Sequence, residues 1–262
     1  MAGQRTVASD ESGSLTIGKI RLADLREVLA KGYDDFTAMP SHAVFLCVVY
    51  PVLGLLIGRV LRGLPLLPML YPLVAGFALI GPFAALGLYE LSRRRELGLD
   101  TSVGRVFDVL RSPGLSGIAA LGAMLLIIFI SWLMTAQAVY YAAFDGMVPG
   151  SLAELFRQVL TTRAGWILAI AGNGLGFLFA VITFSLSVVS FPMVLDRHVD
   201  AAEAAATSLR AVAANPVTMA VWGLIIGTSL LLGSLFFFVG LIVVLPILGH
   251  ASWHLYRKVV PH

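Results

Sequence analysis

The longest uncharged stretch of the sequence constrains the fold more than any other feature. No Asp, Glu, Lys or Arg occurs between Pro216 and Arg257. A single helix over this stretch would be about 60 Å long, twice the roughly 30 Å hydrocarbon thickness of a bilayer. The chain must therefore turn back within it, with Gly233 as the expected hinge and Gly240 as the alternative. The stretch predicts a helical hairpin that crosses a membrane twice.

Other apolar runs predict further membrane crossings. A span takes about 20 apolar residues, and the candidates are 41–60, 66–91, 114–141, 164–192, 217–234 and 237–257. Only 13% of the residues are charged and 58% are hydrophobic, whereas a soluble domain usually carries about 25% charged residues. We therefore expect an all-α, polytopic membrane bundle of about six transmembrane helices over 40–262, after a disordered tail at 1–16.

The expected spans follow a pattern that predicts three repeated helical hairpins. Each pair is preceded by an amphipathic or small-residue helix that ends near Pro40, Pro113 or Pro216. In the first such helix, 17–39, one face is formed by Leu22, Leu25, Leu29, Tyr33 and Phe36. We expect this helix to lie along the membrane surface or against the bundle. In the alternative reading, the prolines only mark helix boundaries.

The distribution of basic residues predicts the topology. Six spans place both termini on one side, and of the 18 Lys and Arg residues only Arg59, Arg62, Arg157 and Arg163 fall on the other. Cytoplasmic loops carry the excess of Lys and Arg, so both termini are expected in the cytoplasm. The segment 142–163 is then external. Its capping-box spacing at Ser151 and the apolar residues that follow predict a short amphipathic helix on the membrane surface.

Three histidines are the candidate ligands for a metal or haem. His250 and His254 lie four residues apart on the last expected span and share a face, and His42 begins the first span. Zinc usually takes three or four protein ligands, so two histidines form at most part of a site. We expect all three near the wet interface, where water and headgroups satisfy the ring nitrogens. The sequence therefore predicts no bound metal, haem or other cofactor.

One carboxylate lies close to a span. Buried acids often mark ion pathways, and Glu90 is followed three residues later by an arginine run. We expect an ion pair with Arg93 or Arg94 near the interface. The sequence contains no Walker loop, HExxH, GxSxG or dinucleotide fingerprint. An enzyme is therefore not expected.

Small residues at helical spacing predict close helix packing. The pairs are Gly54 with Gly58, Gly172 with Gly176, and Gly223 with Gly227. Such pairs let helix backbones approach closely, and Asn173 could hydrogen-bond across helices. The alternative is a substrate site built from broken helices.

Four segments carry a family resemblance: YPLVAGFALIGPFAALGLYELSRRRE, LPILGHASWHLYRK, GYDDFTAMPSHA and FPMVLDRHVDAAEAAATSLRAVAANP. They resemble a bacterial family of predicted integral membrane proteins of unknown function, over nearly the whole chain from about residue 20. The resemblance implies a proteobacterial inner-membrane protein. It implies no reaction.

These observations favour a non-catalytic protein that packs against other membrane proteins, or against itself, as an accessory, assembly or scaffold component. The first alternative is a transporter or channel for a small or apolar, lipidic substrate. A polar substrate would require several polar groups at mid-membrane, where Asn173 is nearly alone. The second alternative is a haem- or metal-binding, redox-associated protein. The formal charge of +3 is too small to favour nucleic acid as a partner.

Overall fold

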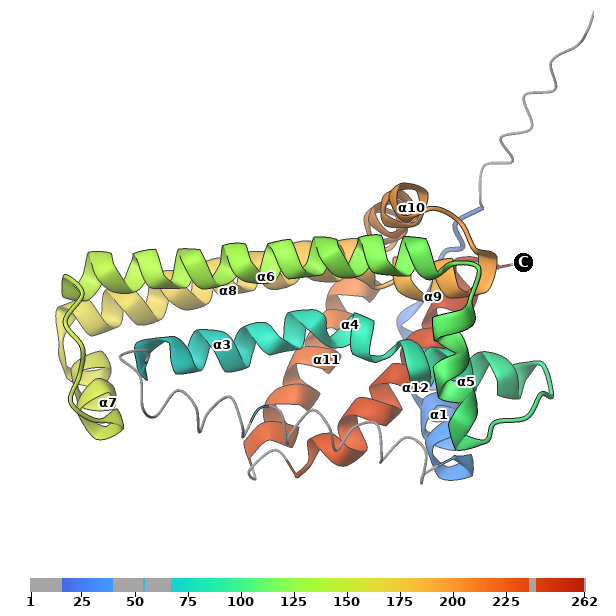
Figure 1. Cartoon of the computed structure of the whole chain (residues 1–262), viewed down its shortest axis with the longest axis horizontal. Coiled ribbons are helices and arrows are strands. Elements are labelled where there is room, and N and C mark those ends of the chain that lie inside the picture. The colour runs from blue at the N-terminus through green and yellow to red at the C-terminus, as the bar shows by residue number, and fades with distance from the viewer. Residues whose placement is uncertain (1–15, 40–53, 55–66, 236–238, 262) are drawn as a thin grey trace, which may run out of the picture.

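The computed structural model describes residues 16–39, 54, 67–235 and 239–261 (Figure 1). Every regular element in these ranges is a helix, which confirms the expected all-α class. Three helices are long and apolar enough to cross a membrane: Leu115–Phe144, Arg163–Arg197 and Pro216–Leu235. A fourth crossing results if the bent pair Leu70–Gly76 and Gly81–Glu96 is one span. The count of six stays a prediction. The last expected span, 237–257, is not among these helices, and 41–60 lies outside the described ranges except for Gly54.

The longest hairpin is formed by α6 (Leu115–Phe144) and α8 (Arg163–Ser187), which run side by side (Figure 1). They match the expected spans 114–141 and 164–192, and α8 leads into α9 (Ser190–Arg197). The amphipathic helix predicted within 142–163 is α7 (Leu152–Thr161), which lies across the end of the hairpin (Figure 1). Its predicted cap is confirmed, because the Ser151 hydroxyl accepts the backbone N–H of Glu154 at 3.1 Å.

The expected span 66–91 is a broken helix. It begins with η1 (Leu67–Met69) and α3 (Leu70–Phe77), and continues through η2 (Ala78–Ile80), α4 (Gly81–Ala84) and α5 (Leu86–Glu96). The bend between its two parts is 41°. Pro82 stands at the start of the second part, where its missing N–H costs no helical hydrogen bond.

The last hairpin consists of α11 (Pro216–Leu235) and α12 (Leu241–Val259). The chain therefore reverses between these two helices, as the uncharged stretch predicts. Gly233 and Gly240 flank the reversal, and a Cβ on Gly240 would lie 2.8 Å from the Cα of Gly233. Both proposed hinge glycines thus serve the turn, because they allow the two helix ends to meet.

Each helix that precedes an expected hairpin packs on the second span of another hairpin. These helices are α1 (Leu22–Ala38), η3 (Val103–Arg111) and α10 (Ala201–Ala214). α1 packs along α12, η3 on α5, and α10 on α9. Pro113 precedes α6 by two residues and Pro216 is the first residue of α11, whereas Pro40 lies outside the described ranges. The three-hairpin repeat itself stays a prediction.

The contact face of α1 differs from the one expected. The structure buries Leu25, Val28, Gly32 and Asp35, while Leu22 is 52% exposed and Tyr33 is 58% exposed. The reason lies in the backbone approach to α12. A Cβ on Gly32 would lie 2.7 Å from the Cβ of Ala251. The backbones of α1 and α12 therefore come closest at Gly32, and the larger apolar side chains of α1 lie beside this contact and not within it.

The densest part of the core lies where α5, α9 and α12 meet. It contains large side chains with 2% exposure or less: Phe191, Met193, Leu195, Trp253, Leu255 and Tyr256. By contrast, α6 and α11 keep many large apolar residues at the surface, among them Ile127, Met134, Leu224 and Leu231. The packed end and the apolar shafts are what a partly lipid-exposed bundle requires.

Candidate functional site

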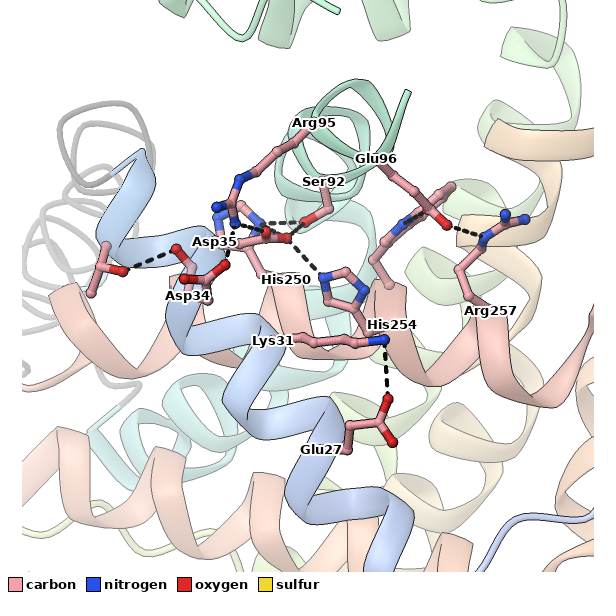
Figure 2. Close-up of polar contacts among 12 residues, drawn as sticks. Glu27, Lys31, Asp34, Asp35, Ser92, Arg95, Glu96, His250, His254 and Arg257 are labelled. Atoms are coloured by element: carbon pink, nitrogen blue, oxygen red, sulfur yellow. Dashed lines mark hydrogen bonds and ion pairs between the residues drawn. The ribbon is translucent and has the colours of Figure 1, made fainter. Parts of the chain in front are cut away.

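A buried carboxylate joins three helices at the packed end of the molecule (Figure 2). Asp35 of α1 is 4% exposed. Its carboxylate accepts the Ser92 hydroxyl at 2.5 Å, the His254 Nε2–H at 2.9 Å, and the Arg95 guanidinium. Ser92 and Arg95 belong to α5 and His254 to α12, so one side chain links three segments that are distant in sequence.

His250 extends this network into the protein interior. Its Nδ1 lies 2.7 Å from the Ser92 oxygen. The single hydroxyl proton of Ser92 is directed to the Asp35 carboxylate, so the Ser92 oxygen accepts from His250 and Nδ1 must carry a hydrogen. The opposite nitrogen, Nε2, is buried without a hydrogen-bond partner among the described residues. The Leu88 backbone faces the ring but does not meet hydrogen-bond geometry with that atom.

These contacts correct the expected surroundings of the histidines. The sequence predicts a wet interface around them, whereas His250 is fully buried and the His254 side chain is 15% exposed. Protein groups, not water or headgroups, bind Nδ1 of His250 and Nε2 of His254. The expectation failed because the sequence does not show that α1 covers this face of α12.

The charge state of Asp35 follows from competing effects. Burial disfavours ionisation, but the hydrogen bonds from His254, Ser92 and Arg95 outweigh it and lower the pKa of Asp35 to about 2. The group is therefore a carboxylate at neutral pH and can only accept hydrogen bonds. Sequence reasoning missed Asp35, although its spacing from Leu25, Val28 and Gly32 places it on one helical stripe.

Ion pairs surround the cluster on both sides. Glu90, 2% exposed, bonds to Arg93 at 2.8 Å and lies 3.6 Å from Arg94, which confirms the predicted pair. At the other end of α1, Lys258 bonds to Glu27 at 2.7 Å and lies 3.3 Å from Asp24. Charged contacts therefore hold α1 against α12 along much of its length.

The histidines gather no third metal ligand in the part of the chain that the structure describes. No group of three or more His, Cys, Asp or Glu side chains there could hold a metal ion. His42, the third histidine of the sequence hypothesis, lies outside that part. The described residues form a hydrogen-bonded network that joins α1, α5 and α12, and Nε2 of His250 has no hydrogen-bond partner within it.

A second polar feature lies on the apolar shaft. Asn173 of α8 is exposed. Its Oδ1 accepts the Tyr71 hydroxyl at 2.6 Å, and its Nδ2 donates to the Ala169 carbonyl at 2.7 Å. Ten residues separate Asn173 from Arg163 at the start of α8, which is about 15 Å, half the hydrocarbon thickness. Asn173 therefore lies inside the candidate span Arg163–Arg197, about three turns from its first charged residue.

The predicted packing glycines occupy different surroundings. A Cβ on Gly176 would come within 3.0 Å of the Trp132 ring, and one on Gly223 would make ordinary contact with Phe184. A Cβ on Gly54, Gly172 or Gly227 would meet no described atom within 4 Å. Gly58 lies outside the described ranges. The close approaches that the structure does contain occur elsewhere as well, at Gly32, Gly165 and Gly249.

Comparison with known proteins agrees with the membrane character of the chain. Residues 70–196 match the model of a family described as "predicted integral membrane protein (DUF2189)". No curated protein and no solved structure matches the chain. The matched region covers the broken helix, the long hairpin and α9. The chain is an integral membrane protein with several apolar helices in contact with the lipid bilayer, and the family description gives no function.

Proposed function

We propose that the protein is a non-catalytic accessory, assembly or scaffold component that packs against other membrane proteins through the exposed face of α8. The observation that carries the proposal is Asn173. One amide hydrogen of this side chain has no acceptor among the described residues, although the side chain is exposed on an apolar helix. A polar group at this depth gains stability from a partner helix that supplies an acceptor.

The surroundings of Asn173 suit such a partner. Ile170 is 71% exposed and Phe177 is 72% exposed, and both share the face of Asn173. On either side, Gly172 and Gly174 leave the α8 backbone open, since a Cβ at either position would meet nothing within 4 Å. Apolar exposure alone is explained by lipid. The amide between two open glycines is better explained by a second helix.

The alternatives draw less support from the same residues. A transporter for a polar substrate would line a path with several mid-membrane polar groups, whereas Asn173 is exposed at the surface and its polar side-chain partner is Tyr71 alone among the described residues. A redox role would use the histidines as ligands, whereas His254 is bound to Asp35 and His250 to Ser92. These contacts indicate that the histidines stabilise the packed end of the molecule, while the exposed face of α8 remains available to bind a partner.

We further propose a multi-pass protein of the bacterial inner membrane with both termini in the cytoplasm and α7 outside. The basic ends of α5, α9 and α12 support this orientation. The last turns of these helices carry Arg93, Arg197 and Arg257. The three helices lie towards the end of the molecule that holds the C-terminus, opposite α7 (Figure 1). Positive charge accumulates on the cytoplasmic side of membrane proteins.

Site-specific photo-cross-linking in native membranes tests the packing role. The photo-reactive residue p-benzoylphenylalanine replaces Phe177 in one variant and Ile127 of α6, which is 65% exposed, in the matched control. We expect discrete protein adducts from position 177 and lipid adducts from position 127. The protein adducts should disappear when Asn173→Leu is added, because the leucine removes the amide.

The adduct mass also identifies the partner class. A mass of twice the chain indicates self-association, and other discrete masses indicate a different membrane protein. Lipid adducts alone from position 177, in membranes where the protein is abundant, would refute the proposal. Protein adducts that persist unchanged in the Asn173→Leu background would equally show that the amide does not recruit the partner.

A further inference from the structure

The short helix η3 has three distinct faces. A 3-10 helix has 3.0 residues per turn, so residues three apart lie above one another. Val106 and Val109 are buried against the protein, while Phe107 is 56% exposed and Leu110 is 63% exposed. The third face carries Arg105, Asp108 and Arg111. One face thus packs on the protein, one is apolar and open, and one is charged.

The helix α7, at the other end of the hairpin, divides in the same way. Val159 packs against α8, where a Cβ on Gly165 would come within 2.4 Å of its Cα. Leu152, Phe156 and Leu160 form an apolar stripe that is 45%, 58% and 61% exposed. Beside this stripe lie Arg157 and Thr161, both exposed. The protein leaves the apolar stripe uncovered.

The helix between these two elements has a length that matches a bilayer. α6 begins four residues after η3 ends and contains 30 residues, which corresponds to about 45 Å. A bilayer is about 40–45 Å thick when its headgroup regions are included. η3 and α7 lie across opposite ends of this helix (Figure 1), so both coincide with headgroup layers.

We propose that η3 and α7 are paired interfacial anchors, each bound to one leaflet of a phospholipid bilayer. Phe107 and Leu110 enter the acyl boundary of one leaflet, and Phe156 and Leu160 enter that of the other. This is the depth at which amphipathic helices lie. The first turn of α8, which follows α7 directly, is also exposed, with Trp166 at 55% and Ile167 at 52%.

The charges fit the same occupant. Arg111 and Arg157 have no ion-pair partner among the described residues, and each lies beside an open apolar stripe. Guanidinium groups bind phosphates, and phospholipid headgroups supply phosphates at this level of the membrane. The two anchors, separated by the rigid α6, fix the depth of the hairpin. The inference does not depend on the packing role of Asn173.

Fluorescence depth measurements on the full-length protein test the anchors. Cys47 is the only cysteine of the sequence, so Cys47→Ser gives a cysteine-free background. In this background, single cysteines at Phe107→Cys and Phe156→Cys carry an environment-sensitive NBD label. Matched controls are Arg105→Cys and Thr161→Cys, which lie on the polar sides of the same two helices. All four positions are exposed, so the label displaces no packed side chain. Each variant is reconstituted in phosphatidylcholine vesicles that contain lipids brominated in the acyl chains.

We expect brominated lipid to quench labels at 107 and 156 at least about twofold more than labels at 105 and 161, and aqueous iodide to give the reverse order. Longer acyl chains should increase lipid quenching at 107 and 156 together, because α6 holds the anchors at a fixed separation. Equal aqueous access at anchor and control positions would overturn the proposal. Stripes that are shielded in native membranes but open in pure lipid vesicles would also overturn it, and would indicate a protein partner.

Discussion

Replacing Asp35 by asparagine should release α1 from the bundle. The carboxylate accepts hydrogen bonds from Ser92, His254 and Arg95 in a site that is 4% exposed. Asparagine has nearly the same shape, but it carries no charge and places an N–H group among these donors. The substitution therefore removes the ionic acceptor while it leaves the packing volume unchanged.

The expected loss of stability depends on how deeply the Asp35 carboxylate is buried and on which other acceptors its hydrogen-bond donors retain. Breaking a buried charged pair by changing one partner costs about 3–5 kcal/mol. The lower end applies here, because Arg95 is 35% exposed and retains Asp34 at 2.9 Å. A loss of about 3 kcal/mol corresponds to a roughly 100-fold rise in the opening equilibrium of α1.

Hydrogen exchange of the α1 backbone measures this opening directly. Asp34→Asn is the matched control, because this neighbouring carboxylate also pairs with Arg95 but its side chain is 69% exposed. Exposed pairs contribute at most about 1 kcal/mol, so the control should accelerate exchange less than about fivefold. Exchange in Asp35→Asn that stays within the range of Asp34→Asn would show that the buried network does not hold α1.

Three other outcomes are expected. Acid should loosen α1, because the lowered pKa of Asp35, about 2 against an ordinary 3.8, stabilises the fold above pH 4 by about 2 kcal/mol. This contribution is lost as the pH falls towards 2. The protection of the α1 amides, taken relative to the intrinsic exchange rate at pH 6, 4 and 2, should fall only in the last step. Gly176→Leu should lower the melting temperature in detergent, since overpacking against Trp132 costs about 1–3 kcal/mol. Gly172→Leu should leave the melting temperature of the isolated protein unchanged, because a Cβ there meets no described atom. Equal melting temperatures for the two variants would contradict the packing described. Reporter fusions after Gly150 and at the C-terminus should report opposite sides of the membrane, and a common side would exclude the proposed topology.

Local features of the fold could be predicted from the sequence because their causes are local. The side chains of Ser151 and Asp200 accept backbone N–H groups three residues later, and this geometry depends only on residue type and spacing. The ion pair of Glu90 with Arg93 likewise joins neighbours on one helical turn. Pro216 begins its helix for an equally local reason, since the first turn needs no N–H from it.

The candidate site could be predicted only in part. The histidines are visible as a pair because they lie four residues apart on one helix. Their partner Asp35 is 219 residues from His254, and no periodicity connects them. The exposed amide of Asn173 was visible as a polar residue in an apolar run, but its bond to Tyr71 depends on how α3 crosses α8.

The sequence by itself determined that the chain is helical, that it lies in a membrane and that its last 40 residues or so must reverse direction. These conclusions follow from charge, apolar length and bilayer thickness, which require no knowledge of neighbours. The tertiary structure alone decided which face of α1 is buried. The periodicity favoured the large apolar side chains, but Gly32 lets the backbones of α1 and α12 approach most closely. This close approach brings Asp35 next to His250 and His254. The buried face of α1 is therefore decided by its contact with a helix distant in sequence, and not by the apolar periodicity of α1 itself.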